Sequence, residues 1–523
     1  MWLLHRHRRS LLLPPRGAGD HPVGGADPGD SRGTDCDRFD PASAALMERL
    51  NYVVSLLETQ RTHSASSAPA ITPGSISNTV SPGWPVIAQD HIPQLPPQVL
   101  SHCNLSCRVL MWPIISTEGY DAVLESLFLS EKSDPESRLS RPQSVTEEDF
   151  PAHARAFLAN VHTKNPVVEY KTLMRYSNDA AENGVGWDGP SCLVLLTSAL
   201  GIVSTTFQRV STTQQAQPES NRELADACYF AARKRIGLLS ATSLLYLQCH
   251  FLSGVYEMYN LRPLEAWHSF YVVSTAKPLY TRTRNPGLVD AETNDLEQRL
   301  FWSASKSEFV DDIPQEFPQE ESWYYYLFEV SQQRTMYQVI SSFYSSRQDT
   351  QLLEASVGVL TQDAIELERH QTLAGSRLPP WLQFVEGEAS DRELPYFVRT
   401  RSLSVQDSIL RPFLFLLIHS TTLQSPTIYG FAQRCLEGCY TLIDLNDIQH
   451  RHHGSWFQAR AAFRCALTIL AAKKSEKITV RSDWRHFIDV SLSVVEFWAK
   501  DADDLQRLAV VLRNLYDSMA SYD

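Results

Sequence analysis

The sequence has few cysteines, and their spacing fits neither a disulfide framework nor a zinc module. Nine cysteines are spread over 523 residues, at positions 36, 103, 107, 192, 228, 249, 435, 439 and 465. No two of them are separated by two residues, which is the spacing that thiolate zinc sites commonly use. This pattern favours a reducing compartment and argues against a zinc-binding module within this chain.

The sequence also lacks a long apolar run. The longest one, residues 192–203, is interrupted by Thr197 and Ser198 and is too short to span a bilayer. Near the N-terminus, residues 5–9 are all His or Arg and divide two short apolar stretches, so no signal-peptide core is formed. The absence of acidic residues before Asp20 is compatible with a mitochondrial transit peptide, but the Pro and Gly that follow would break its helix. We expect neither a membrane span nor secretion.

Positive charge is in deficit. Lys and Arg number 47 against 60 Asp and Glu, which gives a formal net charge of -13. A protein with this net charge is not expected to bind nucleic acid through a broad basic surface, so any DNA contact must be local. Hydrophobic residues make up 43% of the chain, which is ample for a large core.

The first hundred residues divide into three segments by composition. Residues 1–40 are rich in Arg, Gly, Pro and Asp without periodicity, and we expect them to be disordered. Residues 41–61 predict a short coiled-coil-like helix, because apolar residues recur there at steps of four, three and four: Leu46, Leu50, Val53 and Leu57. This seam spans fewer than two heptads, so a solvated amphipathic helix is as compatible with it as a dimer contact. Residues 62–107 are a Pro- and Ser-rich linker.

Residues 108–523 predict one large all-α body. Apolar residues recur at helical spacing over 244–258, 484–498 and 505–515, and strand-type alternation is hard to find. Thr146 with Asp149 resembles a capping box, and Pro190 follows Asp188-Gly189 where a first helical turn would place it. Helix-breaking residues predict loops near 208–221, 277–292, 311–322 and 371–395.

Several short motifs match known sites in spacing but not in context. Residues 184–189 have the glycine spacing of a dinucleotide-binding turn, yet the preceding segment is helical, so an inter-helix loop is the better interpretation. Ser303 and Lys306 have the spacing of a serine–lysine catalytic pair without the companion motifs. Asp311-Asp312 and Asp503-Asp504 lack the pattern of a magnesium-binding helix and are expected to be solvated charges near helix ends.

Two further groups of residues have side chains that commonly bind metal ions. His452 and His453 are adjacent and would point to different faces of a helix, so a structural or capping role is predicted. The pairs Cys103/Cys107 and Cys435/Cys439 are expected to be small core residues on helices. We therefore predict no catalytic, cofactor-binding or metal-binding residues in this chain.

Several strings, taken together and in order, resemble the middle homology region of fungal binuclear zinc-cluster transcription factors. The longest is residues 225–259, ADACYFAARKRIGLLSATSLLYLQCHFLSGVYEMY, which continues into NLRPLEAW at 260–267. The others are LMWP at 110–113, QRLFWS with KSE at 298–308, SWYYYL at 322–327, RPFL at 411–414, RHHGSW at 451–456 and the helix at 466–472. The resemblance covers about 108–515 and implies an all-α regulatory domain that modulates transcription in the nucleus.

The chain departs from this family at its N-terminus. Members begin with six cysteines and basic residues that bind two zinc ions and read DNA, followed by a linker and a short coiled coil that pairs two subunits. Here Cys36 stands alone, so zinc is expected only if a missing N-terminal cluster exists. Either the chain is a regulator that lost its DNA reader, or the first ~40 residues derive from a mispredicted or alternative start.

The resemblance therefore implies a non-enzymatic transcription regulator, with control of a metabolic, secondary-metabolite gene cluster as a family-level expectation. Its expected partners are DNA, through a reader that is absent here, the transcription machinery, and a second copy bound through residues 46–57. Two alternatives stay open: a helical small-molecule-binding protein or enzyme with an inter-helix pocket, and a DNA-free partner of a full-length relative. Converging perturbed carboxylates or histidines in a pocket would favour an enzyme, whereas an apolar or shallow cavity would favour regulation.

Overall fold

The computed structural model describes eight stretches of the chain: residues 108–115, 146–214, 222–283, 291–308, 321–344, 350–384, 392–421 and 425–520. Of these residues 79% are helical and none forms a strand, so the predicted all-α class is confirmed. The predicted dimer helix with Leu46, Leu50, Val53 and Leu57 lies outside these stretches. No helix within them is long and apolar enough to cross a membrane.

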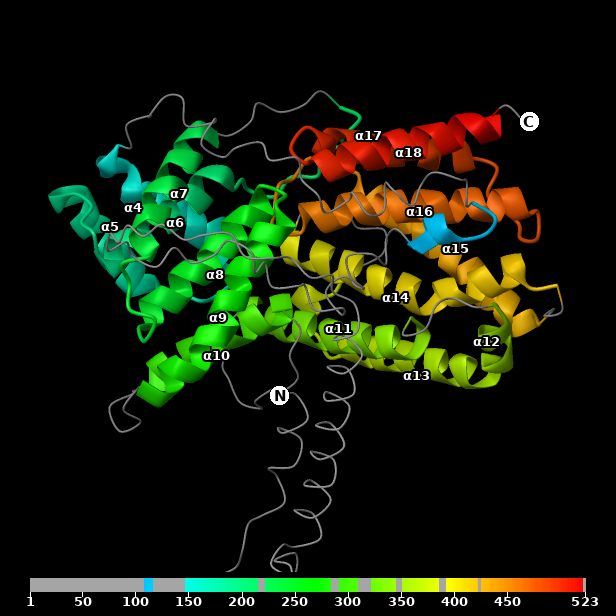
Figure 1. Ribbon diagram of the computed structural model, residues 1–523, viewed down its shortest axis with the longest axis horizontal. Helices are drawn as coiled ribbons and strands as arrows, with labels where there is room; N and C mark the ends of the chain where they lie inside the picture. Colours follow the sequence, from blue (N-terminus) through cyan, green and yellow to red (C-terminus); the bar gives the residue numbers. More distant parts are fainter. Residues whose placement is uncertain are drawn as a thin grey trace, which may run out of the picture. The chain divides into compact units, whose positions relative to one another are not determined.

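The first group of helices surrounds a hydrophobic core that we call the N-terminal core (Figure 1). Its members are α4 (Phe150–Phe157), α5 (Tyr170–Asn183), α6 (Gly189–Val203), α7 (Arg222–Ile236), α8 (Leu244–Tyr259), α9 (Pro263–Thr283) and α10 (Ala291–Glu308). Helix α6 lies at the centre and packs against α4, α5, α7 and α8. Its buried residues lie on all sides, which explains why its sequence is a nearly continuous apolar run.

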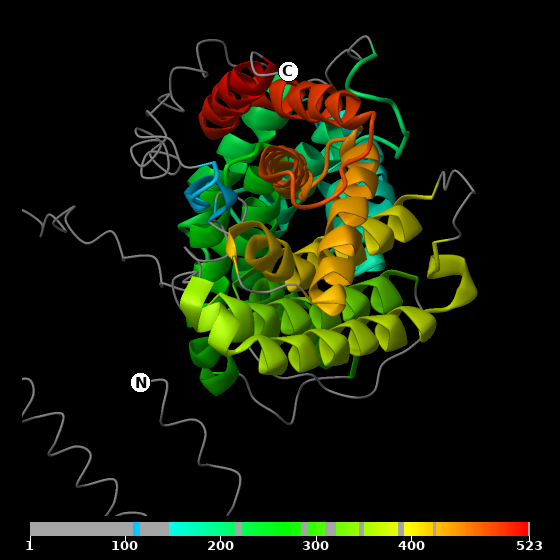
Figure 2. The same ribbon diagram turned by 90° about the vertical axis from the view of Figure 1, so that its right-hand side faces the viewer.

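The second group surrounds a larger core that we call the C-terminal core. Its members are the short helix η3 (Arg108–Met111), α11 (Glu321–Phe343), α12 (Thr350–Ala355), α13 (Val357–Ser376), η8 (Pro380–Leu382), α14 (Glu393–His419), α15 (Pro426–Asn446), α16 (Ser455–Ser475), α17 (Trp484–Ala499) and α18 (Asp503–Ala520). Figures 1 and 2 show these helices in layers, with α11 and α13 beneath α14 and with α17 and α18 above α16. Helix α14 contacts α11, α13, α15 and α16 and so links the layers.

Local sequence signals account for several helix boundaries. Helix α6 begins at Gly189 with Pro190 in its first turn, as predicted, and the Asp188 carboxylate accepts a hydrogen bond from the Ser191 N–H at 2.9 Å. The predicted capping box at Thr146 is wrong. Its side chain caps nothing, because residues 147–149 form a 3₁₀ turn (η5) before α4 begins.

Two predicted loops begin too early. Residues 371–376 of the loop predicted at 371–395 belong to α13, and the loop predicted at 277–292 overlaps α9. Residues 277–283 belong to α9, which continues through Pro278 although proline removes a backbone hydrogen bond. Ala276 and Tyr280 pack against the N-terminal core, and this burial holds the last two turns helical. The apolar contacts of α9 thus outweigh the tendency of proline to end a helix.

Close packing of α4 against α6 leads to a first testable prediction. A Cβ atom added at Gly201 would lie 2.1 Å from the backbone oxygen of His153. Gly201→Ala should therefore force the two helices apart and lower the free energy of unfolding by roughly 1–3 kcal/mol or more.

Gly430, on α15, is the matched control, because a Cβ added there meets nothing within 4 Å. Gly430→Ala should raise the free energy of unfolding by up to ~1 kcal/mol, since alanine favours helix over glycine. Urea unfolding followed by circular dichroism measures both changes. Equal effects of the same sign would show that the α4–α6 contact is not tight.

Candidate functional site

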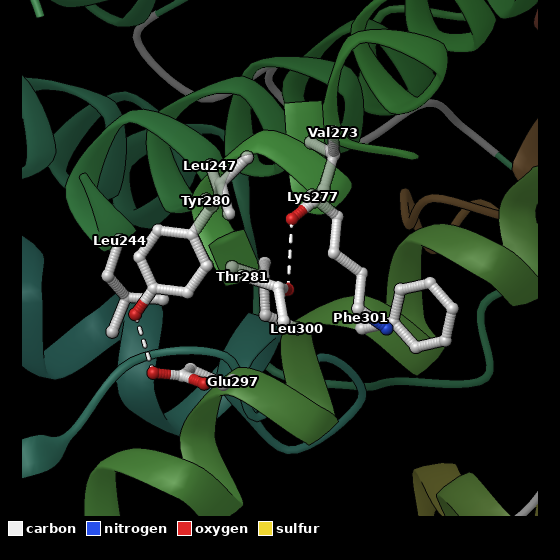
Figure 3. Close-up of a pocket in the computed structure, with 9 residues that line it drawn as sticks. All are labelled: Leu244, Leu247, Val273, Lys277, Tyr280, Thr281, Glu297, Leu300 and Phe301. Atoms are coloured by element: carbon white, nitrogen blue, oxygen red, sulfur yellow. Dashed lines mark hydrogen bonds between the residues drawn. The ribbon is translucent and has the colours of Figure 1, made fainter. Parts of the chain in front are cut away.

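A small pocket lies between α8, α9 and α10 (Figure 3). Its free volume is about 30 Å³, which corresponds to on the order of two water molecules. Most of the lining is apolar, and the polar groups are few; the lining residues are Leu244, Leu247, Val273, Lys277, Tyr280, Thr281, Glu297, Leu300 and Phe301. We call this the Lys277 pocket.

Lys277 and the Tyr280–Glu297 pair occupy different sides of the pocket. Figure 3 shows the Lys277 side chain extending towards Phe301, and its ammonium lies over the Phe301 ring as a cation–π contact. The Tyr280 hydroxyl donates a hydrogen bond to Glu297 Oε1 at 2.5 Å. Burial lowers the pKa of Lys277 to about 7, and no charged group counteracts this shift within the described stretches. Near neutral pH the amine is therefore divided between its charged and neutral forms.

A second polar feature joins the two cores, and we call it the polar junction. Its centre is Glu393, the first residue of α14, whose Oε1 lies 2.5 Å from Lys164 Nζ and 2.9 Å from His450 Nε2. Burial opposes ionisation of Glu393, but Lys164 and the hydrogen bond with His450 outweigh it and lower the pKa to about 2. Burial also lowers the pKa of Lys164 against the pull of Glu393, yet the direct contact between the two groups favours the ion pair.

The loop between α15 and α16 completes the junction. Arg451 donates to the backbone oxygen of Tyr259 at 2.9 Å and pairs with Asp501, which also pairs with Arg222. The Gln449 N–H donates to the backbone oxygen of Val210 at 2.8 Å. Arg222 and Tyr259 belong to the N-terminal group, and Val210 lies in the segment that connects α6 with α7. The loop therefore ties this part of the chain to Asp501, between α17 and α18.

His452 is the most deeply buried histidine of the junction. Its Nδ1 accepts a hydrogen bond from the Gly454 N–H, and its Nε2 lies 2.9 Å from Gln458 Oε1. The ring therefore carries its proton on Nε2 and is neutral. Burial, reinforced by His450, lowers the pKa of His452 to about 3. His452 has the predicted structural role, but the expected helical setting is wrong, because His452 and His453 lie in the loop before α16.

Asp407, Cys435 and Cys439 bring three potential metal ligands within 4.8 Å of one another, in a group that we call the Asp407 cluster. All three are buried, but the Asp407 carboxylate already pairs with Arg411 Nη2 at 2.6 Å and Arg464 Nε at 2.8 Å. Burial would raise the pKa of Asp407, yet the two guanidinium groups together lower it. The hydrogen bond with Cys435, together with burial, raises the pKa of Cys439. The hydrogen bond with Cys439 lowers the pKa of Cys435, but burial and the nearby Asp407 outweigh it and raise that pKa.

These contacts do not fit a zinc site. Two arginines would repel the cation, and zinc requires thiolates where this environment keeps thiols. The cluster is a structural ion pair, and the prediction that Cys435 and Cys439 are small core residues is confirmed. Cys36, Cys103 and Cys107 lie outside the described stretches.

The structure also places the other motifs. Residues 184–188 form a loop between α5 and α6, as predicted. Ser303 is buried inside α10, whereas the side chain of Lys306 is not described. Asp311 and Asp312 lie outside the described stretches. Asp503 is exposed at the start of α18.

The prediction that Asp504 is a solvated charge is wrong. Its Oδ2 accepts hydrogen bonds from Trp456 Nε1 and Arg460 Nη1, both at 3.0 Å. Helix α16 packs against α18 and places these two buried donors beside the first turn of α18. Their hydrogen bonds hold the Asp504 carboxylate in the interior. Adjacent acidic residues thus have different environments because only one of them faces α16.

No family model matches the sequence, and searches of curated proteins and of solved structures each gave no significant match.

Proposed function

We propose that the chain is a transcription regulator of the fungal zinc-cluster family and that residues 108–523 are its regulatory domain. The observation that carries this proposal is the ordered set of family-like strings between residues 110 and 472. Two of them contribute to the buried polar groups of the fold. Arg411, from the RPFL string, pairs with Asp407, and the RHHGSW string at 451–456 supplies Arg451 and His452 to the polar junction.

The chemistry of the Lys277 pocket supports a regulatory role over a catalytic one. Its lining contains one lysine, one tyrosine and one carboxylate, and no histidine or cysteine. Catalytic sites usually bring together several titratable groups with matched pKa values in a cleft. This pocket is small and mostly apolar, which is the character expected of a regulatory cavity.

The remaining parts of the proposal follow from the family resemblance. The regulator would act in the nucleus, contact the transcription machinery and pair with a second copy through Leu46, Leu50, Val53 and Leu57. Its targets would be the genes of a metabolic cluster, such as one for a secondary metabolite. Specific DNA reading would depend on a zinc cluster outside the printed sequence or on a full-length relative bound as a partner.

The test is a reporter assay with the full chain fused to an unrelated DNA-binding domain, with the matching operator placed upstream of the reporter gene. We expect reporter transcription to change several-fold relative to the DNA-binding domain alone. Deletion of the gene followed by transcript profiling is the second measurement, and it should alter a coherent set of transcripts that the wild-type gene restores. An inert fusion together with an unchanged transcript profile would refute the proposal.

A further inference from the structure

The Lys277 amine has no ion-pair partner among the side chains that the structure describes, although one carboxylate lines the same pocket. Lys277 is partly buried, and this burial lowers the pKa of its amine. The one carboxylate that lines the pocket, Glu297, is engaged by the Tyr280 hydroxyl on the other side. A buried ammonium without a counter-ion is unfavourable, so an anion that enters the pocket would remove part of this cost.

The surroundings of Lys277 restrict the kind of anion. The amine lies over the Phe301 ring, and the pocket lining also includes the side chains of Val273 and Leu300. The pocket is open to solvent, and its free volume of about 30 Å³ accommodates a group with only a few heavy atoms. A carboxylate is of this size, and an apolar remainder would lie against the lining and extend towards the opening.

We propose that the Lys277 pocket binds a small monocarboxylic acid, whose carboxylate pairs with the Lys277 ammonium while its apolar part contacts Phe301 and Leu300. The tetrahedral, highly charged phosphate ion is disfavoured, because the pocket offers one cation and no arginine. This inference concerns binding by α8, α9 and α10 and does not rest on the proposed role in transcription.

The ion pair predicts proton uptake on binding. The free amine is largely neutral above pH 7, and the carboxylate stabilises its protonated form. At pH 8 the full chain should therefore take up to about one proton per bound acid. Isothermal titration calorimetry in buffers with different ionisation enthalpies measures this uptake, and the wild-type protein alone is sufficient for the measurement.

Calorimetric titrations of the full chain with butyrate and benzoate test the site, with butanol and benzyl alcohol as neutral analogues. We expect each acid to bind roughly 10–100-fold more tightly than its alcohol, as for other charge-assisted hydrogen bonds. Lys277→Met keeps the length and apolar stem of the side chain and should reduce acid binding to the level of the alcohol. Lys171→Met, at an exposed lysine on α5, is the matched control and should bind as the wild type does.

The outcomes separate clearly. Binding of the acids with proton uptake, lost in Lys277→Met and kept in Lys171→Met, supports the site. Equal affinity for acids and alcohols, acid binding that survives Lys277→Met, or no binding of either acid at roughly 10 mM would each overturn it. A failed reporter assay with intact acid binding would refute only the proposed function, and the reverse result would refute only this site.

Discussion

Replacing Asp407 with alanine should lower the free energy of unfolding by about 3–5 kcal/mol, one of the largest effects expected of a single substitution in this protein. The carboxylate lies between Arg411 and Arg464, and both the aspartate and Arg411 are almost completely buried. Its removal leaves two guanidinium groups in a low-dielectric interior without an anion. Urea unfolding of the full chain, followed by circular dichroism, provides the measurement.

Two further variants make this test specific. Asp407→Asn keeps the shape of the side chain but not its charge, so it should destabilise the protein nearly as much as alanine does. Glu366→Gln breaks an exposed pair with Arg369 on α13 and should leave the unfolding midpoint unchanged within error. If Asp407→Asn left the unfolding midpoint as unchanged as Glu366→Gln does, the cluster would be solvated, and the description of a buried ion pair would be wrong.

The helices of the two cores were predictable where a regular apolar pattern determines them. The spacing over 244–258, 484–498 and 505–515 anticipated α8, α17 and α18, because each presents one face or more to a core. The apolar run at 192–203 has no single face and instead marks α6 as the fully surrounded helix. The spacing of apolar residues, which determines which face of a helix is buried, can be read directly from the sequence.

The polar groups were less predictable, because their partners come from distant parts of the chain. Asp407 and Arg411 are four residues apart within an apolar stretch of α14, and that local pattern is a usable signal of a buried pair. Arg464 lies on α16 and carries no comparable signal. In the sequence Arg411 belongs to a family-like string, and the cluster itself was not predicted.

Lys277 was missed for a different reason. The adjacent Pro278 predicts a loop at this position, whereas the structure has a helix that lines a pocket. The pocket depends on α10 returning against α9, which brings Leu300 and Phe301 over the lysine. Local sequence rules do not predict such a return, because it is determined by tertiary packing.

The second large effect concerns pH. The folded protein should lose stability as the pH falls from about 6.5 towards 4.5, because buried histidines bind protons only after unfolding. His452 is completely buried and its pKa is lowered to about 3, whereas burial lowers that of His250 to about 4. The stability that a neutral histidine contributes is complete above its unfolded pKa, and it declines as the pH falls towards the folded value.

For His452 this decline approaches ~1.4 kcal/mol per pH unit, or roughly 2.5 kcal/mol between pH 6.5 and 4.5. Glu393 also loses its contribution to stability as the pH falls, because its folded pKa of about 2 is below the unfolded value. This second loss of stability begins only below about pH 4.3. The two effects overlap below about pH 4.3, because the His452 decline continues to its folded pKa of about 3. Above pH 4.5 the Glu393 loss is absent, and the change caused by His452→Gln isolates the histidine effect from that of buried acids with raised pKa values, such as Glu257.

Urea unfolding of the full chain at several pH values between 7 and 4.5 gives the slope of the free energy against pH. His452→Gln retains a hydrogen-bonding side chain without a titrating ring, and it should reduce this slope by up to ~1.4 kcal/mol per pH unit. His370→Gln removes an exposed histidine that contacts Glu366 on α13, and it serves as the control for the loss of an imidazole from the surface. A slope unchanged by His452→Gln would mean that His452 protonates without unfolding, and the neutral ring that accepts from Gly454 would not be the dominant folded form.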